Sequence, residues 1–305
     1  MAFQPRSLRP LLAGALLSLL APSNSTAEGL PYEQRKDLVY GESHGVGLLM
    51  DVFTPRDKTN GLAIIDVVSG AWSSDRSKIR DHTLAQIFSI YCAKGYTVFG
   101  IRPGSKDRFT AADMEKHLRV GIRFVKEHAE EYHIDPERLG MTGASAGGHL
   151  ALLEALNADA ARPDPTKDAA RPNSRVRAVG VFFPPTDLLE WEVWKPADPE
   201  IVGQLLFPGG VAGHSADELA KRAREASPLH RVSGKPSIPF LLIHGDADPL
   251  VPLSHSQRIV EAIHKAGGTA ELIVKPGGGH PWLTLAEEVR VMADWFDKQL
   301  ANAPK

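Results

Sequence analysis

The stretch LGMTGASAGGHL, residues 139–150, decides the fold of this chain. It begins as a short apolar run typical of a buried strand and continues from Ala146 as a helix. Between the two lies Gly143-Ala144-Ser145-Ala146-Gly147, which has the pattern G-x-S-x-G. A strand that turns sharply into a helix strains the residue at the turn and requires small residues two positions before and after it. The stretch therefore predicts an exposed Ser145 hydroxyl at the positive end of a helix. The alternative is a glycine-rich helix start that Ser145 merely caps.

Strands and helices alternate along the rest of the chain, as judged from apolar runs and amphipathic windows. Two short strands, Asp37–Gly41 and Gly47–Phe53, form a predicted edge hairpin. The further predicted strands are Leu62–Val68, Tyr96–Ile101, Arg138–Gly143, Val176–Phe183, Phe240–His244 and Thr269–Val274, and the predicted helices are Ile79–Ala93, Ala111–Tyr132, Ala146–Leu156, Ser254–Ala266 and Ala286–Leu300. Such alternation predicts the α/β class, with a mostly parallel central sheet and helices on both faces.

Two segments interrupt this alternation. Residues 186–233 are too long for a plain connection between strands and contain a helical piece near Asp217–Ala226, so we expect a cap insertion over the carboxyl edge of the sheet. Arg162–Ser174 is rich in Pro and Asp and predicts a surface loop. Residues 28–305 are then one domain with an inserted cap.

Residues 1–27 have the three parts of a secretory signal: Arg6 and Arg9, an apolar run from Leu11 to Ala21, and small residues up to Ala27. We expect cleavage near Ala27 and a secreted or periplasmic protein. The alternative is a retained membrane anchor, but an apolar run of about eleven residues is short of the roughly twenty that a spanning helix needs.

The composition bounds the remaining possibilities. Of 305 residues, 43% are hydrophobic and 24% charged, which is typical of a globular protein. A net charge of -2 without long Lys/Arg runs argues against nucleic acid as a partner. Cys92 is the only cysteine, so no intrachain disulfide can form, and its apolar helical surroundings favour a place in the core. The oligomeric state stays open.

A serine hydroxyl needs a base to take its proton, so Ser145 predicts a histidine and a carboxylate elsewhere. The apolar strand Phe240–His244 runs into an acidic loop that contains Asp248, and Gly277-Gly278-Gly279-His280 follows one helix and one strand later. Serine, aspartate and histidine in this order are typical of one superfamily of hydrolases.

The segments Gly143–Leu150, His244–Pro252 and Gly277–His280 resemble the esterase/lipase branch of the α/β-hydrolase superfamily. The resemblance covers about residues 35–300. It is greatest to secreted feruloyl and acetyl-xylan esterases and to the catalytic domain of prolyl oligopeptidases. In these proteins the acid is often the aspartate of an H-G-x-x-D motif that is followed by V-P. In this chain that aspartate is Asp248, which the resemblance implies as the acid rather than Asp246. The resemblance implies a serine carboxylester hydrolase in which Ser145 is the nucleophile, His280 the base and Asp248 the acid.

The resemblance also implies two backbone donors for an oxyanion. One is the N–H of Ala146, the residue after the nucleophile. The second comes from the loop after the Leu62–Val68 strand, where related esterases carry H-G-G-G-W and this chain has Val68-Ser69-Gly70-Ala71-Trp72. Gly70 or Ala71 is expected to supply it, with Trp72 as a pocket wall or, alternatively, a core residue.

Several aromatic residues in or beside the cap suggest an apolar acyl or aryl pocket, although plain packing explains them equally well. They are Phe182, Phe183, Trp191, Trp194 and Phe207, of which Phe183 and Trp191 join Trp72 as pocket candidates. His149 and His244 are expected to be structural. Asp187 is the alternative acid. Metal-ligand spacing and nucleotide-binding motifs are missing, so we expect neither a metal nor another cofactor.

The expected substrate is a small or polysaccharide-linked ester, with a short acyl, acetyl-sugar or feruloyl group. Two other functions stay open. A peptidase of the prolyl-oligopeptidase type shares the motifs, but we expect a chain of this length to be too short to contain a propeller domain as well. A non-catalytic binding protein on a hydrolase scaffold is the other.

Overall fold

The computed structural model describes residues 29–157, 172–191 and 202–301. The expected signal peptide, Trp194 and most of the expected loop at Arg162–Ser174 lie outside the described residues.

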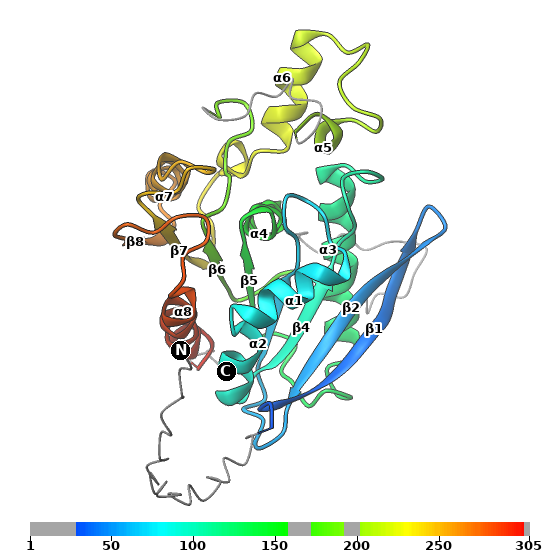
Figure 1. Ribbon diagram of the computed structural model, residues 1–305, viewed down its shortest axis with the longest axis vertical. Helices are drawn as coiled ribbons and strands as arrows, with labels where there is room; N and C mark the ends of the chain where they lie inside the picture. The colour runs from blue at the N-terminus through cyan, green and yellow to red at the C-terminus, as the bar shows by residue number, and fades with distance from the viewer. Residues whose placement is uncertain (1–28, 158–171, 192–201, 302–305) are drawn as a thin grey trace, which may run out of the picture. The chain divides into compact units, whose positions relative to one another are not determined.

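Among the described residues, eight strands form one sheet in the order β1-β2-β4-β3-β5-β6-β7-β8, with β1 and β8 at its two edges (Figure 1). Only the pairs β1/β2 and β2/β4 are antiparallel, and every pair from β4 onward is parallel. The strands are β1 Tyr32–Ser43, β2 Val46–Pro55, β3 Ala63–Val67, β4 Thr97–Arg102, β5 Leu139–Ala144, β6 Ala178–Phe182, β7 Pro239–Gly245 and β8 Thr269–Lys275. The predicted α/β class with a mostly parallel sheet is confirmed.

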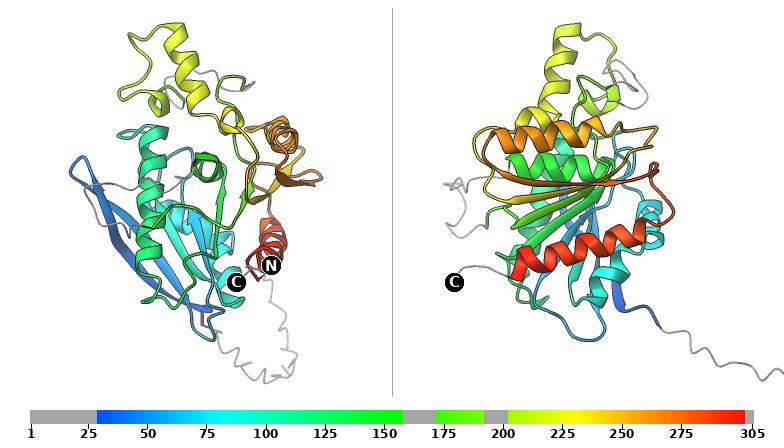
Figure 2. Two further views of the ribbon diagram at one scale, coloured as in Figure 1. Left: turned by 180° about the vertical axis from the view of Figure 1, so that it is seen from behind. Right: turned by 90° about the vertical axis from the view of Figure 1, so that its left-hand side faces the viewer.

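Helices cover both faces of the sheet, and Figure 2 shows α4 and α7 on one side and α8 on the other. The helices are α1 Arg76–Leu84, α2 Ile87–Ala93, α3 Ala111–Glu127, α4 Ala146–Asn157, α5 Gln204–Leu206, α6 Ala216–Glu225, α7 Ser254–Lys265 and α8 Leu285–Ala301. All of β3 is buried, with Ile65 in the core under α3, α4 and α7 and Ile64 in the core under α2 and α8. Burial on both faces explains why the inner strands are continuous apolar runs.

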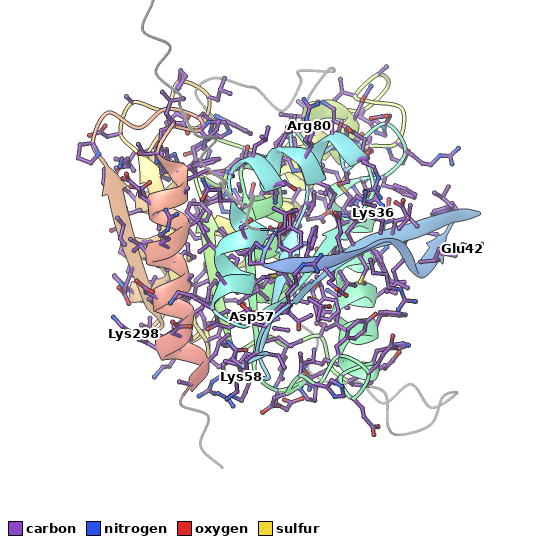
Figure 3. All side chains as sticks on the ribbon, turned by 60° about the horizontal axis from the view of Figure 1, so that its bottom comes forward. Lys36, Glu42, Asp57, Lys58, Arg80 and Lys298 are labelled. Atoms are coloured by element: carbon purple, nitrogen blue, oxygen red, sulfur yellow. The ribbon has the colours of Figure 1, made fainter. Side chains whose placement is uncertain are left out.

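The edge hairpin is longer than predicted, since β1 and β2 extend into polar sequence at both ends. His44 and Gly45 form its turn, both with positive φ (50° and 71°), as a two-residue turn between twisted strands requires. Lys36 and Glu42 lie exposed on β1 (Figure 3). Charged side chains on an edge strand disfavour pairing with another chain.

The expected single helix over Ile79–Ala93 is wrong, because α1 and α2 are separate helices. The chain turns at Gln86, which has a left-handed φ of 59°. This turn allows α2 to lay Phe88 on Phe53, with ring centroids 3.7 Å apart, and to bury Cys92. Tertiary packing thus overrides a periodicity that looks continuous in the sequence.

The long insertion between β6 and β7 carries α5, α6 and a 3₁₀ turn at Pro228–Arg231. A capping box begins α6 at the N-terminus of this helix. Ser215 Oγ accepts from the Glu218 N–H, and the Glu218 carboxylate accepts from the Ser215 N–H. Ala223 packs from α6 into the core that α3 and α4 share.

Candidate functional site

Ser145 lies at the turn between β5 and α4 with a φ of 52°, a left-handed conformation that is rare for a residue with a side chain. Its N–H donates to the carbonyl of Phe182 (2.9 Å). The flanking glycines make the turn possible, since a Cβ on Gly147 would lie 2.1 Å from the Val67 carbonyl oxygen and one on Gly143 would lie 2.6 Å from the Gly147 backbone. This close packing is the physical reason for the G-x-S-x-G spacing.

Three side chains that are distant in sequence form one hydrogen-bonded relay. His280 Nε2 lies 2.8 Å from Ser145 Oγ, and His280 Nδ1 lies 2.7 Å from Asp248 Oδ2. With the imidazole neutral, Nδ1–H donates to the carboxylate and Nε2 accepts from the serine hydroxyl. Phe183 packs edge-on against the imidazole, with centroids 4.6 Å apart, so that the ring is held from the side as well.

Both oxygens of the Asp248 carboxylate accept hydrogen bonds. Its Oδ1 accepts from the N–H groups of Leu250 (2.8 Å) and Val251 (2.9 Å), and His244 Nε2 lies 3.5 Å from Oδ2. Burial alone would raise the pKa of Asp248, but hydrogen bonds from His244, His280 and the Val251 N–H outweigh burial and hold the pKa well below its usual range. Asp248 is therefore ionised at neutral pH.

His244 is buried beside this relay rather than distant from it. Its Nε2–H donates to the Val251 carbonyl (2.8 Å), and its Nδ1 accepts from Ser256 Oγ (2.7 Å). These two bonds fix the tautomer with its proton on Nε2, and the same nitrogen lies 3.5 Å from Asp248 Oδ2. The sequence predicted a structural histidine here but not its contact with the acid.

The rival acids are engaged elsewhere. Asp187 pairs with Arg258 Nη2 at 2.9 Å, and its Oδ1 accepts from the N–H groups of Leu189 and Glu190. Asp246 Oδ1 accepts from the Gly277 N–H (2.6 Å). His149 accepts from Trp72 Nε1 (3.0 Å) and donates to the Ala226 carbonyl (2.7 Å), and burial lowers its pKa to about 4.

The loop after β3 narrows the choice of oxyanion donors. The Gly70 N–H donates to the Ser73 carbonyl (3.0 Å) and is thus used inside the loop, whereas the N–H groups of Ala71 and Ala146 have no partner among the described residues. Among the described residues, Ala71 rather than Gly70 therefore keeps a backbone N–H that can meet an oxyanion. Ala71 has a φ of 47°, and the Ser69 carbonyl accepts from the Gly147 N–H (3.2 Å), which ties this loop to the serine turn.

A cavity of about 320 Å³ opens above Ser145 and His280. All three predicted aromatic residues line it: Trp72, Phe183 and Trp191. Trp72 is also 1% exposed and packs in the core, so both expectations for it hold together. Further lining residues, which the sequence did not indicate, are Leu250, Val251, Pro281 and Leu285 on the apolar side and Lys78, Asp81 and His82 on a polar side.

Within the described ranges, no group of three or more His, Cys, Asp or Glu side chains gathers to hold a metal ion. Among the same residues, no helix combines the length and the apolar character needed to cross a membrane. The chemistry that Ser145, His280 and Asp248 can perform is transfer of the serine proton to His280, which activates the hydroxyl as a nucleophile while Asp248 stays ionised.

The serine turn, the relay at the carboxyl edge and the parallel sheet define the class: an α/β hydrolase of the esterase branch. Residues 50–263 match the BD-FAE family, and the chain belongs to this family. The resemblance predicted from the motifs is thereby confirmed.

Known proteins agree with this class. The chain is 26% identical over 269 residues to Esterase LipQ of Mycobacterium tuberculosis, covering 84% of this chain and 59% of that protein. It is 25% identical over 234 residues to an acetylxylan esterase of Xylanibacter ruminicola, covering 76% and 43%. The chain thus spans about half the length of these relatives. A solved structure, a truncated carbohydrate esterase from gut microbiota, has a TM-score of 0.75 at 25% identity, covering 90% of this chain and 99% of the other. These similarities agree with the esterase branch of the α/β hydrolases.

Proposed function

We propose that this chain is a serine carboxylester hydrolase that acts through Ser145, His280 and Asp248. The observation that carries the proposal is the relay from Asp248 through His280 to Ser145 Oγ, with both hydrogen bonds under 3 Å, at the base of a largely apolar cavity. The positive φ of Ser145 supports it further, because strained backbone is concentrated at functional turns.

The proposed reaction has two steps. Ser145 Oγ attacks the ester carbonyl while His280 Nε2 takes the hydroxyl proton, and the N–H groups of Ala71 and Ala146 donate to the oxyanion. The bond between the carbonyl carbon and the alkoxide then breaks, His280 gives its proton to the alkoxide, and the alcohol leaves while the acyl group stays on Ser145 Oγ. Water repeats the attack with His280 as base, and the acid is released as Ser145 regains its proton. Asp248 stays ionised throughout and stabilises the charged imidazole.

We propose as substrates small or polysaccharide-linked esters with a short acyl, acetyl-sugar or feruloyl group. The size and apolar side of the cavity support a small acyl or aryl group. The acetylxylan esterase and the carbohydrate esterase among the similar proteins support the sugar-linked classes. A panel of acetyl, butyryl, octanoyl and feruloyl esters ranks these candidates by kcat/KM.

Labelling with a fluorophosphonate probe tests the nucleophile. We expect one labelled site in the wild type, complete loss in Ser145→Ala, and unchanged labelling in the matched control Ser77→Ala, which lies exposed on α1. Labelling that survives in Ser145→Ala contradicts the proposal. An absence of labelling in a folded wild type favours the non-catalytic binding protein.

A second measurement separates the esterase from a peptidase. We expect turnover of p-nitrophenyl acetate and little or none of a proline peptide-anilide. The reverse preference would assign the same relay to a peptidase.

We also propose that residues 1–27 direct export, and that residues 28–305 form one domain with a cap over the site. The support for export is the sequence pattern alone. Mass spectrometry of the protein purified from its native compartment tests it. The expected mature N-terminus follows Ala27, and an intact Met1 on protein found in the periplasm or outside the cell contradicts cleavage.

A further inference from the structure

A second histidine–aspartate pair lies beside the cavity. His82 Nδ1 is 2.6 Å from Asp66 Oδ2, and both residues are buried, with Asp66 at 0% and His82 at 7% exposure. Asp66 comes from the middle of β3, and His82 comes from α1, which follows the oxyanion loop. A carboxylate inside an otherwise apolar strand is costly unless a charged or hydrogen-bonding partner meets it, and His82 is that partner.

The other nitrogen of the imidazole is available to a ligand. His82 lines the cavity, while its Nδ1 is taken by Asp66, which lies behind it on β3. Within the described part of the chain, Nε2 of His82 has no hydrogen-bond partner. This atom is not fully buried. The accessible part of the ring therefore includes a polar atom, and with Nδ1–H directed to Asp66 or with the ring protonated, Nε2 can accept or donate.

Lys78 and Asp81 complete a polar wall on the same helix. Lys78 Nζ lies 3.3 Å from Asp81 Oδ2, and both residues line the cavity. The lysine stem passes over the oxyanion loop, since a Cβ on Gly70 would lie 2.9 Å from Lys78 Cδ. The wall thus contains an imidazole, an ammonium and a carboxylate, next to the loop where the reacting carbonyl is proposed to bind.

The charges of this wall are balanced in pairs, Asp66 with His82 and Asp81 with Lys78. A balanced set of donors and acceptors suits a neutral hydroxyl, which both donates and accepts, better than it suits a free carboxylate or an ammonium group. A structural role alone explains the pair poorly, because apolar residues of similar size often hold two elements together as well as a buried ion pair does.

We propose that His82, oriented by Asp66 and flanked by Lys78 and Asp81, binds a hydroxyl group of the ester substrate and so selects hydroxylated esters. The inference rests on the proposed function, because it concerns which ester the same cavity accepts. The hydroxyl has two candidate sources: the sugar alcohol that leaves, or a phenolic acyl group.

Matched ester pairs test it and distinguish the sources. Monoacetylated methyl xyloside is compared with cyclohexyl acetate, and methyl ferulate with methyl cinnamate. The main variant is His82→Asn, whose amide can still meet Asp66 from the Nδ1 position but places no group at Nε2. We expect the ratio of kcat/KM for one hydroxylated ester over its hydroxyl-free partner to fall about ten-fold or more, as a lost hydrogen bond predicts. The pair that responds identifies the source.

Two further variants keep the test decisive if His82→Asn folds poorly. Lys78→Met retains the stem over Gly70 and removes the ammonium, and we expect the same ratio to fall about three-fold. Arg80→Met is the control: Arg80 is exposed on α1 and does not line the cavity, so its ratio should match the wild type (Figure 3).

Unchanged ratios in both His82→Asn and Lys78→Met overturn the inference. If kcat/KM falls equally for the two esters of each pair, the ratio is also unchanged, and the His82–Asp66 pair is then purely structural. In either case, continued hydrolysis of cyclohexyl acetate by the wild type leaves the proposed function standing. A wild type that hydrolyses no ester and takes no fluorophosphonate label refutes the proposed function itself.

Discussion

Two histidine–aspartate pairs border the same cavity, and they differ in how the carboxylate is held. Asp248 lies on a loop after β7 and accepts from two backbone N–H groups besides its histidine. Asp66 lies inside β3, and its Oδ1 has no hydrogen-bond partner among the described residues. The first carboxylate is stabilised by its loop whether or not His280 is present, whereas the second depends on His82.

The imidazoles differ in what they face. His280 Nε2 lies 2.8 Å from a serine hydroxyl, whereas His82 Nε2 has no hydrogen-bond partner within the described ranges. The same pair of residue types thus becomes a proposed base in one case and a proposed binding group in the other. The two roles differ because only His280 has a nucleophile at its Nε2. The number of hydrogen bonds to each carboxylate decides how much the stability of the fold depends on its histidine.

The largest expected effect is on turnover. Asp248→Asn should lower kcat for p-nitrophenyl acetate about 10⁴-fold, because the asparagine favours the wrong tautomer of His280, as in other serine triads. Asp66→Asn should stay within about ten-fold of the wild type, since His82 does not touch the reacting atoms. Steady-state kinetics on folded protein measures both. An equal loss in the two variants would erase the distinction between the pairs.

Stability should show the reverse order. His82→Ala leaves Asp66 buried without its partner and should reduce the free energy of unfolding by about 3–5 kcal/mol. His280→Ala should cost less than about 1 kcal/mol, because Asp248 keeps its N–H donors and His244. Urea unfolding at pH 7 measures both values. A cost for His280→Ala as large as that for His82→Ala would show that the loop does not support Asp248 independently.

His244 offers a smaller, sharper test of the loop. His244→Asn removes the N–H beside Asp248 and should lower kcat roughly ten-fold. His244→Gln can place an amide near the original Nε2 and should recover most of that loss. Steady-state kinetics with p-nitrophenyl acetate in the two variants measures the effect. A failure of glutamine to rescue would assign His244 a packing role only.

The smallest effect concerns pH. Burial lowers the pKa of His82, but the charge and hydrogen bond of Asp66, with a contribution from Asp81 against Lys78, outweigh burial and raise it above 6.5. A raised pKa in the folded state adds stability that is fully present below pH 6.5 and is lost as pH rises through the folded value. The difference in unfolding free energy between wild type and His82→Asn should therefore be larger at pH 6 than at pH 9. A difference that is constant or grows with pH contradicts the raised pKa.

Local patterns in the sequence predicted most of the architecture. The apolar runs located every inner strand to within a few residues, because strands buried on both faces must be apolar throughout. The close packing at Gly143 and Gly147 likewise appears directly as the spacing around Ser145. Asp66 within the run Leu62–Val68 indicates that the strand needs a buried polar partner, but nothing in the neighbouring sequence indicates that this partner is His82.

The sequence by itself determined the fold class and the position of the serine turn, since both depend on residues that are neighbours in the chain, and short motifs indicated the three members of the proposed relay. Only the tertiary structure showed that the Gly70 N–H is used inside its own loop, and which partners Asp187, Asp246 and Asp248 meet. It also broke the expected helix at Gln86. These choices depend on hydrogen bonds and packing between segments far apart in the chain, and no local pattern records which donor a carboxylate will meet or which acceptor a loop N–H will meet.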